Sequence, residues 1–377
     1  MSELNASNLR KEHGNEGPDL VGVTELTSPY FMVPPSGTTA ERPQNPQKGT
    51  LRFNTDIGSL EYFKGDTIGW ESISRTTPNL NGGARGIIFG GYQAPTRVNV
   101  IQYLTIPTLG NTLDFGDLLG VTGRPSALAS RTRAVCMGGY DGSSVLNTIQ
   151  YVTTASIGNS IDFGDLTYAR NQAGGASSST RGIGGGGNPI TNAMDYITIA
   201  ATGNAVDYGD LTVARQSPNA AASSTRMIFI SGEISPGTTN ATDYVTIATT
   251  GNASDFGDCT TAVRLSSACS NSTRVIKAGG DFNPSSNTVT NVIEFFTIAS
   301  TGNGTDFGDL SVVRTEFASC SSPTRAVFAG GSNPSPTNFN TIDYVEILTT
   351  GNAVDFGDTA TATSMRPGGT SNAHGGL

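Results

Sequence analysis

The chain has 377 residues, a formal net charge of −9 and only 14% charged residues, whereas glycine occupies 48 positions. The low charge content excludes a highly charged disordered chain and a coiled coil, and the negative balance argues against nucleic acid as a partner. No apolar run approaches the roughly 18 residues of a membrane-spanning helix, so we expect no membrane insertion.

Residues 1–33 begin with the polar string MSELNASNLRKEHGNEG and contain few core candidates beyond LVGV and YFMV. They lack the apolar centre of a secretion signal, so we expect assembly in the cytoplasm of the producing cell without a signal peptide. We interpret this segment as an extended anchoring arm.

Residues 34–74 predict a small β segment. The strings TLRFNT, LEYFKG and WESIS are typical of strands, and DIGS between the first two is typical of a turn. A piece of this size is too small for a core of its own, so we expect it to dock or to oligomerise. The alternative is a leading β-hairpin that packs on the domain that follows.

The same segment resembles one that is common in the fibres and other virion proteins of tailed bacteriophages. The matching residues are Ser36 to Thr39, Arg42-Pro43, Gly49, Arg52 to Asp56, Gly58, Leu60-Glu61, Gly65 and Trp70, while Phe63 holds the place of the family's tyrosine. The resemblance implies a location in the virion. It also implies that the N-terminal arm contacts other virion proteins and that residues 1–74 could form a homo-oligomer.

From residue 75 onwards a unit of about 50 residues recurs six times. Each copy contains an arginine before a short apolar run, an aromatic residue, and then a Gly-Asn followed by the phrase Asp-aromatic-Gly-Asp. The arginines are Arg85, Arg133, Arg181, Arg226, Arg274 and Arg325. The aspartates that open the phrase are Asp114, Asp162, Asp207, Asp255, Asp306 and Asp355.

Each copy predicts four short strands, because its apolar runs are short, rich in β-forming residues and separated by glycine or Gly-Asn. In the last strand, Val206 and Tyr208 share a face but Leu211 is out of phase, and a bulge at Gly209 would restore the register. Strands made of small residues suit the crowded centre of a ring. We therefore predict an all-β chain in which residues 75–377 form a six-bladed β-propeller, closed by the C-terminal segment 363–372 rather than by 75–83.

The order of a glycine pair, a tyrosine and a last-strand aromatic resembles the kelch repeat, although the last aromatic is Phe or Tyr and never the usual Trp. Length varies between copies only after the glycine pair, in the connection to the third strand. In a propeller these connections share one face with the crossings between blades, so we expect a binding face there, the alternative being neutral variation. The candidate binding residues are Tyr92, Gln93, Tyr140, Asp141, Asn188, Asp281, Asn283 and Asn333.

The twelve aspartates of the repeated phrase could form a calcium-binding ring. We favour a structural role instead, in which each aspartate satisfies turn amides or pairs with the nearby arginine. Cys269 and Cys320 occupy equivalent places and are expected to be small buried residues. The sequence predicts no catalytic residue, no metal and no cofactor.

We therefore expect a bacteriophage virion structural protein of the fibre or decoration type, and not an enzyme. The arm would attach to the particle, and the propeller would bind a host-surface glycan or another virion protein. Two alternatives stay open, namely a polysaccharide depolymerase on a propeller scaffold and a purely architectural component of capsid, neck or tail.

Overall fold

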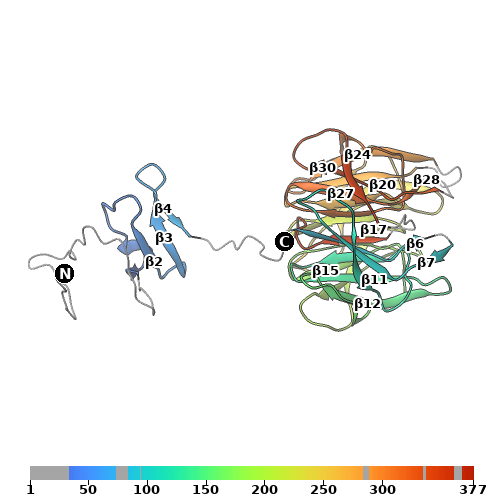
Figure 1. The fold of residues 1–377 in the computed structure, drawn as a ribbon, viewed down its shortest axis with the longest axis horizontal. Coiled ribbons are helices and arrows are strands. Elements are labelled where there is room, and N and C mark those ends of the chain that lie inside the picture. The colour runs from blue at the N-terminus through green and yellow to red at the C-terminus, as the bar shows by residue number, and fades with distance from the viewer. Residues whose placement is uncertain (1–33, 74–83, 94, 283–287, 334–336, 361–366) are drawn as a thin grey trace, which may run out of the picture. The chain divides into compact units, whose positions relative to one another are not determined.

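The computed structural model describes residues 34–73, 84–93, 95–282, 288–333, 337–360 and 367–377. The chain separates into two compact units, residues 1–78 and 79–377, and both are built of strands (Figure 1). The described helical structure is one short 3-10 turn, η1 (Thr39–Glu41), so no described helix has the length to span a membrane. The predicted anchoring arm, residues 1–33, lies outside the described residues.

The small unit is a four-stranded sheet in the order β1 (Ser36–Gly37), β2 (Leu51–Asn54), β3 (Ser59–Phe63) and β4 (Trp70–Ser72). β2, β3 and β4 pair antiparallel and correspond to the three predicted strands. β1 was not predicted, because its two residues are too few to leave a pattern. It pairs in parallel with β2, with Ser36 opposite Phe53.

A buried carboxylate organises this small unit. Glu61 is fully buried, and its oxygens lie 2.6 Å from Arg42 Nη2 and 3.7 Å from Arg52 Nη1. Asn54 donates to the same carboxylate at 3.1 Å. The hydrogen bond from Arg42 is the main cause that holds the pKa of Glu61 below its usual value. Both guanidinium groups lie 5.9 Å from the centre of the Trp70 ring. Arg42, Arg52, Asn54, Glu61 and Trp70 thus form one connected network.

The large unit contains six four-stranded antiparallel sheets within its described residues. In order from first strand to last, they are β32 (Gly368–Ser371), β5 (Arg85–Phe89), β8 (Val100–Thr105) and β9 (Leu113–Asp117); β10 (Ser126–Ala129), β11 (Arg133–Tyr140), β12 (Val145–Thr153) and β13 (Ile161–Asp165); β14 (Gly174–Ser177), β15 (Arg181–Gly185), β16 (Thr191–Thr198) and β17 (Val206–Arg215); β18 (Asn219–Ala222), β19 (Arg226–Glu233), β20 (Thr238–Thr246) and β21 (Ser254–Asp258); β22 (Ser267–Ser270), β23 (Arg274–Asp281), β24 (Val289–Thr297) and β25 (Thr305–Asp309); and β26 (Ala318–Ser321), β27 (Arg325–Ala329), β30 (Thr341–Glu346) and β31 (Val354–Asp358). Two short hairpins, β6 (Tyr92–Gln93) with β7 (Thr96–Arg97) and β28 (Ser332–Asn333) with β29 (Thr337–Asn338), accompany them.

The two ends of the large unit meet in one sheet. β32, from the C-terminal end of the chain, pairs with β5, and Gly368 lies opposite Phe89. The prediction that the C-terminal segment supplies this strand is confirmed, while the competing segment 75–83 lies outside the described residues. The first strands of the sheets contact one another in the cyclic order β32, β10, β14, β18, β22, β26 and back to β32.

The core lies between neighbouring sheets. One cluster joins Ile87, Phe89 and Phe115 of the first sheet to Ala134 and Cys136 of the second. Burying apolar side chains of this size contributes roughly 1.5–3 kcal/mol each. All four cysteines are free and buried, which confirms the prediction for Cys269 and Cys320.

A bulge in the last strand is confirmed, but the predicted position at Gly209 and the shared face of Val206 and Tyr208 are wrong, because Val206 is 52% exposed while Tyr208 is buried. Met194 lies opposite Gly209, but the next residue, Asp195, lies opposite Asp207, so Tyr208 is the extra residue. The same shift occurs in the equivalent strand pair of every sheet. It turns the aromatic side chain inward, with Tyr208 only 2% exposed, and leaves Asp207 in solvent.

Candidate functional site

The repeated phrase joins each sheet to the next. Gly158, in the turn of the second sheet, donates its N–H to Phe115 O of the first sheet at 2.8 Å, and Asn159 Oδ1 accepts from Asp117 N at 3.0 Å. A Cβ on Gly116 would lie 2.5 Å from Gly158 O, so only glycine fits there. Because the turn covers an otherwise open strand edge, the phrase protects that edge from other chains.

The same junction recurs at all six boundaries. The asparagine side chains that accept the amide of the preceding sheet are Asn111, Asn159, Asn204, Asn252, Asn303 and Asn352. Asn111 of the first sheet accepts from Asp358 of the last at 2.9 Å. The backbone amides of the phrase therefore make the joint, and the aspartate side chains do not.

The predicted role of those aspartate side chains is wrong. The carboxylates that open the phrase, such as Asp114 and Asp207, are exposed and have no hydrogen bond or ion pair among the described residues. The bulge is the physical reason, since it points the aromatic residue inward and its neighbours outward. The repeat arginines have other partners.

Each repeat arginine stacks on the aromatic residue of the third strand of its own sheet. The distances from guanidinium carbon to ring centre lie between 4.5 and 4.8 Å. The arginine also donates to a carbonyl of the following sheet, as in Arg133 Nη1 to Ile199 O at 2.9 Å. The series closes where Arg325 of the last sheet donates to Ile106 O of the first at 3.3 Å. These arginines therefore hold neighbouring sheets together.

A second set of repeated polar residues was missed from the sequence. It consists of the buried residue just before each third-strand aromatic, which is Gln102, Gln150, Asp195, Asp243, Glu294 or Asp343. The sequence could have indicated this set, because each member is a polar residue at a strand position whose side chain alternation directs toward the core.

Each of these side chains accepts hydrogen bonds from the segment that leaves the preceding sheet. Asp343, for example, accepts from Ser311 Oγ at 2.7 Å and from the buried Arg314 Nη2 at 2.9 Å. Burial lowers the pKa of Arg314 to about 10, although the negative charge of Asp343 acts to raise it. These buried polar groups are thus paired within the scaffold, whereas the repeated aspartate carboxylates stay exposed and unpaired among the described residues. We therefore look for a binding site among residues that differ between copies.

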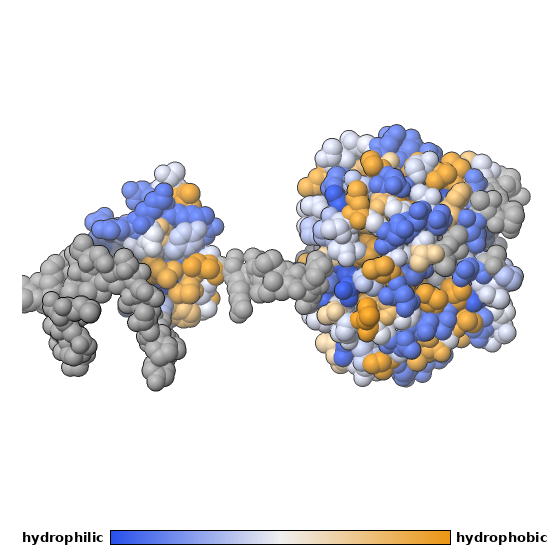
Figure 2. Space-filling view, viewed as in Figure 1, coloured by the Kyte–Doolittle hydropathy of each residue, from blue (hydrophilic) through white to orange (hydrophobic). Residues whose placement is uncertain are grey.

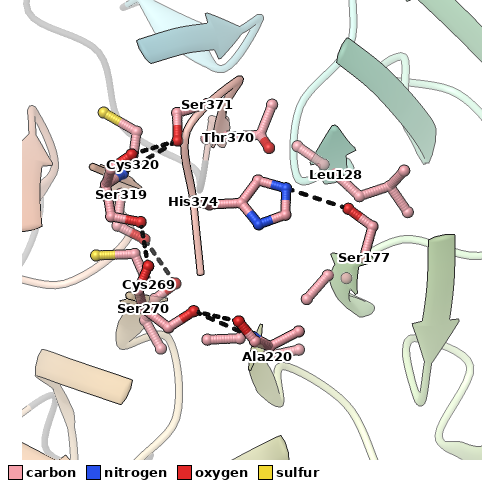
Figure 3. Close-up of a pocket in the computed structure, with 18 residues that line it drawn as sticks. Leu128, Ser177, Ala220, Cys269, Ser270, Ser319, Cys320, Thr370, Ser371 and His374 are labelled. Atoms are coloured by element: carbon pink, nitrogen blue, oxygen red, sulfur yellow. Dashed lines mark hydrogen bonds between the residues drawn. The ribbon is translucent and has the colours of Figure 1, made fainter. Parts of the chain in front are cut away.

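One non-repeated feature is a cavity of about 40 Å³ among the first strands of the sheets (Figure 3). Small side chains such as Ala221, Ser270 and Ser319 line it, and the imidazole of His374 projects into it. His374 Nε2 lies 2.8 Å from Ala129 O, and Nδ1 accepts from Gly376 N at 3.1 Å. Burial lowers the pKa of His374 to about 4. The space suits a few water molecules rather than a sugar.

The chain segment after β32 covers one end of this cavity. Gly375 donates to Ser270 O at 2.8 Å, and a Cβ on Gly376 would collide with Ser177 O. Serine hydroxyls link the first strands around the same end, as in Ser177 Oγ to Ala129 O at 2.7 Å and Ser321 Oγ to Ser270 O at 2.7 Å. These hydrogen bonds tie the first strands and the C-terminal segment together at this end.

The connections from second to third strands lie beside the crossings between sheets, as the sequence predicted. Isolated bridges tie the two kinds of segment together. They are Gly123 with Tyr140, Asn171 with Asn188, Gln216 with Glu233, Arg264 with Asp281, and Thr315 with Ser332. We call the surface formed by these connections the loop face.

The crossings at the loop face are strained. The residue after each bridge has a φ between 55° and 59°, although none is glycine. These residues are Arg124, Gln172, Ser217, Leu265 and Glu316. Left-handed non-glycine residues cost of order 1–3 kcal/mol, and their recurrence in five copies makes this strain a feature of the scaffold. The loop face is the better candidate because the connections between strands two and three differ in length between copies.

The predicted binding residues have different environments there. Gln93 is exposed, and Tyr92, Asn188 and Asn333 are partly buried. Asn283 lies outside the described residues.

Three predicted residues form local contacts. Tyr140 donates its hydroxyl to Gly142 O at 2.9 Å, and Asp141 accepts from the amides of Ser143 and Ser144. Asp281 is a poor candidate for binding, because it is buried and paired with Arg264 at 2.9 Å.

The described residues contain no cluster of three His, Cys, Asp or Glu side chains that could hold a metal ion. No protein-family model matches this chain, and no curated protein matches it.

Proposed function

We propose that this protein is a structural component of a bacteriophage particle, in which a six-bladed kelch-like β-propeller is displayed to bind a host-surface glycan. Residues 1–74 attach the propeller to other virion proteins. The proposal is carried by two features together. One is the segment that resembles phage virion proteins, and the other is a scaffold in which the buried polar groups of the repeat are paired with one another, so that only exposed groups are available for binding.

The propeller is supported by three features of the large unit. Its sheets have four strands each, their first strands consist of small residues, and those strands contact one another in cyclic order. The Gly-Asn turns and the repeat arginines link sheets in the same order, and both series include a link between the last sheet and the first. Such a scaffold is rigid and leaves its connecting loops available for binding.

Attachment through the small unit is supported by its apolar surface. Leu51, Ile57, Ile68 and Ile73 are 37%, 51%, 65% and 46% exposed, and apolar residues gather on one part of the unit's visible surface in Figure 2. A contiguous exposed apolar patch is typical of a surface that contacts another protein.

Glycan binding rather than cleavage is supported by the state of the loop-face carboxylates. Glu233 and Asp281 are both paired with Arg264, at 3.0 and 2.9 Å, and Asp141 is engaged by two backbone amides. A hydrolase needs one carboxyl group as an acid and a second as a base or nucleophile.

The test uses the purified full-length chain and surface polysaccharides extracted from a panel of bacteria. Retention of a polysaccharide on the immobilised protein, without a change in polysaccharide chain length by size-exclusion chromatography, is the expected result. Shortening of the chains would establish a depolymerase. Absence of both retention and shortening would leave an architectural component.

A further inference from the structure

Arg97, at the end of β7 on the loop face, has a guanidinium that the fold positions but does not pair. Its guanidinium carbon lies 4.5 Å from the centre of the Tyr140 ring. The side chain is partly buried, and Nε is buried without a hydrogen-bond partner. No hydrogen bond or ion pair of this side chain occurs among the described residues. A guanidinium has five N–H donors, so this one can bind an added acceptor.

The other described arginines of the large unit differ from Arg97. The six repeat arginines donate to carbonyl groups, and five more bind carboxylates, namely Arg124, Arg170, Arg215, Arg264 and Arg314. Arg131 also has no acceptor for its side chain, but it is exposed and lies in the turn between β10 and β11. Arg97 alone combines partial burial on the loop face with unpaired donors in the described part of the unit.

Two neighbouring sheets hold Arg97 in place. A Cβ on Gly123 would lie 3.5 Å from Arg97 Cδ, and a Cβ on Gly142 would lie 3.1 Å from Nη1. The Tyr140 ring beneath the guanidinium is itself fixed by its hydroxyl bond to Gly142 O. Packing therefore orients the donors before any ligand arrives, which lowers the entropic cost of binding.

The charged neighbour of Arg97 leaves its donors available. Asp141 lies close enough for Arg97 to contribute to the lowered pKa of its carboxyl, but the amides of Ser144 and Ser143 are the larger causes. Asp141 Oδ1 accepts both amides, at 2.7 and 2.6 Å, and forms no ion pair with Arg97.

The hairpin that holds Arg97 also offers groups that suit a sugar. Tyr92 is the direct cross-strand partner of Arg97, so the two side chains are on the same face of the hairpin. Gln93, the next residue, is exposed. Because successive residues of a strand point to opposite faces, Gln93 does not share the face of Tyr92 and Arg97. An aromatic ring beside a guanidinium matches the apolar face and the carboxylate of an acidic sugar.

We propose that Arg97, oriented by Tyr140, binds the carboxylate of an acidic sugar residue in a surface polysaccharide, with Tyr92 contacting the same residue. This inference rests on the proposed adhesive function and specifies its ligand class. The forked guanidinium matches the two oxygens of a carboxylate, and a charge-assisted pair of this kind selects acidic over neutral polymers.

The experiment measures binding of the full-length chain by biolayer interferometry. The acidic probes are polygalacturonate, alginate, hyaluronate and polysialate, and the neutral probes are dextran and mannan. We expect the wild-type protein to bind at least one acidic probe. Arg97→Gln should weaken that binding roughly tenfold or more, Arg97→Lys should retain part of it, and the matched control Arg131→Gln should leave it unchanged.

The outcomes separate this inference from the adhesive function. Binding of neutral polymers only, unaffected by Arg97→Gln, overturns the acidic-sugar site while adhesion stands. Equal losses in Arg97→Gln and Arg131→Gln also overturn the site, because they indicate attraction by overall charge. Failure of the wild-type protein to bind any acidic probe overturns the acidic-sugar site, whereas the adhesive function is decided by the panel of bacterial surface polysaccharides. Unchanged thermal unfolding of each variant shows that a loss of binding is not a loss of fold.

Discussion

The junction between the second and third sheets offers a sharp test of how the repeated phrase works. Gly164 belongs to β13, and Gly203 lies in the turn of the next sheet that covers it. Both have positive φ, 144° and 153°, so alanine is strained at either position. They differ in space, because a Cβ on Gly164 would lie 2.5 Å from the carbonyl of Gly203, whereas a Cβ on Gly203 would meet nothing within 4 Å.

The expected cost follows from this difference. Each substitution pays the backbone strain of order 1–3 kcal/mol. Gly164→Ala must also displace the turn and lose three hydrogen bonds, from Gly203 N to Phe163 O, Ala205 N to Asp165 O and Asp165 N to Asn204 Oδ1, at 2.7, 2.8 and 3.0 Å. At roughly 1 kcal/mol for each bond, Gly164→Ala should be about 3 kcal/mol less stable than Gly203→Ala.

Urea unfolding of both variants, followed by far-ultraviolet circular dichroism, measures the difference. Hydrogen exchange of residues 161–165 and 203–205 should rise in Gly164→Ala and much less in Gly203→Ala. Equal losses of stability in the two variants would refute the reasoning, because the close approach would then have no energetic weight.

Three further predictions concern buried charges. The pKa of His374 is about 4 in the fold against 6.5 for a free histidine, so the fold is favoured by the neutral ring and loses at most about 3 kcal/mol of stability as the pH falls from 6.5 toward 4. The urea midpoints of unfolding at pH 7 and pH 4.5 should therefore differ less in His374→Gln than in the wild-type protein. An unchanged pH dependence in the variant would exclude His374 as the cause. Asp343→Asn leaves the buried Arg314 without its counter-charge and should lower the free energy of unfolding by about 3 kcal/mol, whereas substitution of the exposed Asp355 by Asn should lower it by under about 0.5 kcal/mol. Similar melting temperatures of the two variants, measured by circular dichroism, would contradict this prediction. Glu61→Gln should destabilise the small unit by about 2 kcal/mol, measured as urea unfolding followed by the fluorescence of Trp70, the single tryptophan of the chain. Substitution of the exposed Glu71 by Gln serves as the control. A loss of stability in Glu71→Gln as large as that in Glu61→Gln would count against the network.

Much of the strand pattern could be predicted because the repeat marks it six times. Glycine pairs and Gly-Asn turns located the strand ends, and the out-of-phase Leu211 indicated a bulge, which the structure has at Tyr208 rather than at Gly209. The period of the repeat shows which residues are equivalent, but it does not predict which groups of neighbouring sheets form hydrogen bonds with each other. The partner of Arg133 is a carbonyl at Ile199 in the following sheet, and a main-chain acceptor leaves no side-chain signature in the sequence.

The candidate site was harder to predict for a related reason. Arg97 lies on a hairpin outside the repeated landmarks, so no second copy draws attention to it. His374 follows the last repeat, where the pattern ends, and only the fold brings it beside Ala129. The loop face could be predicted as a surface, whereas the particular side chains that remain unpaired there depend on packing between sheets.

The most direct test of the account is an experimental structure of the full-length chain. We predict six four-stranded sheets around one axis, with residues 368–371 paired beside residues 85–89 and each Gly-Asn turn on the preceding sheet. A different number of sheets, or a β5 edge without the C-terminal strand, would contradict the account, and the assignment of the loop face would be lost with it.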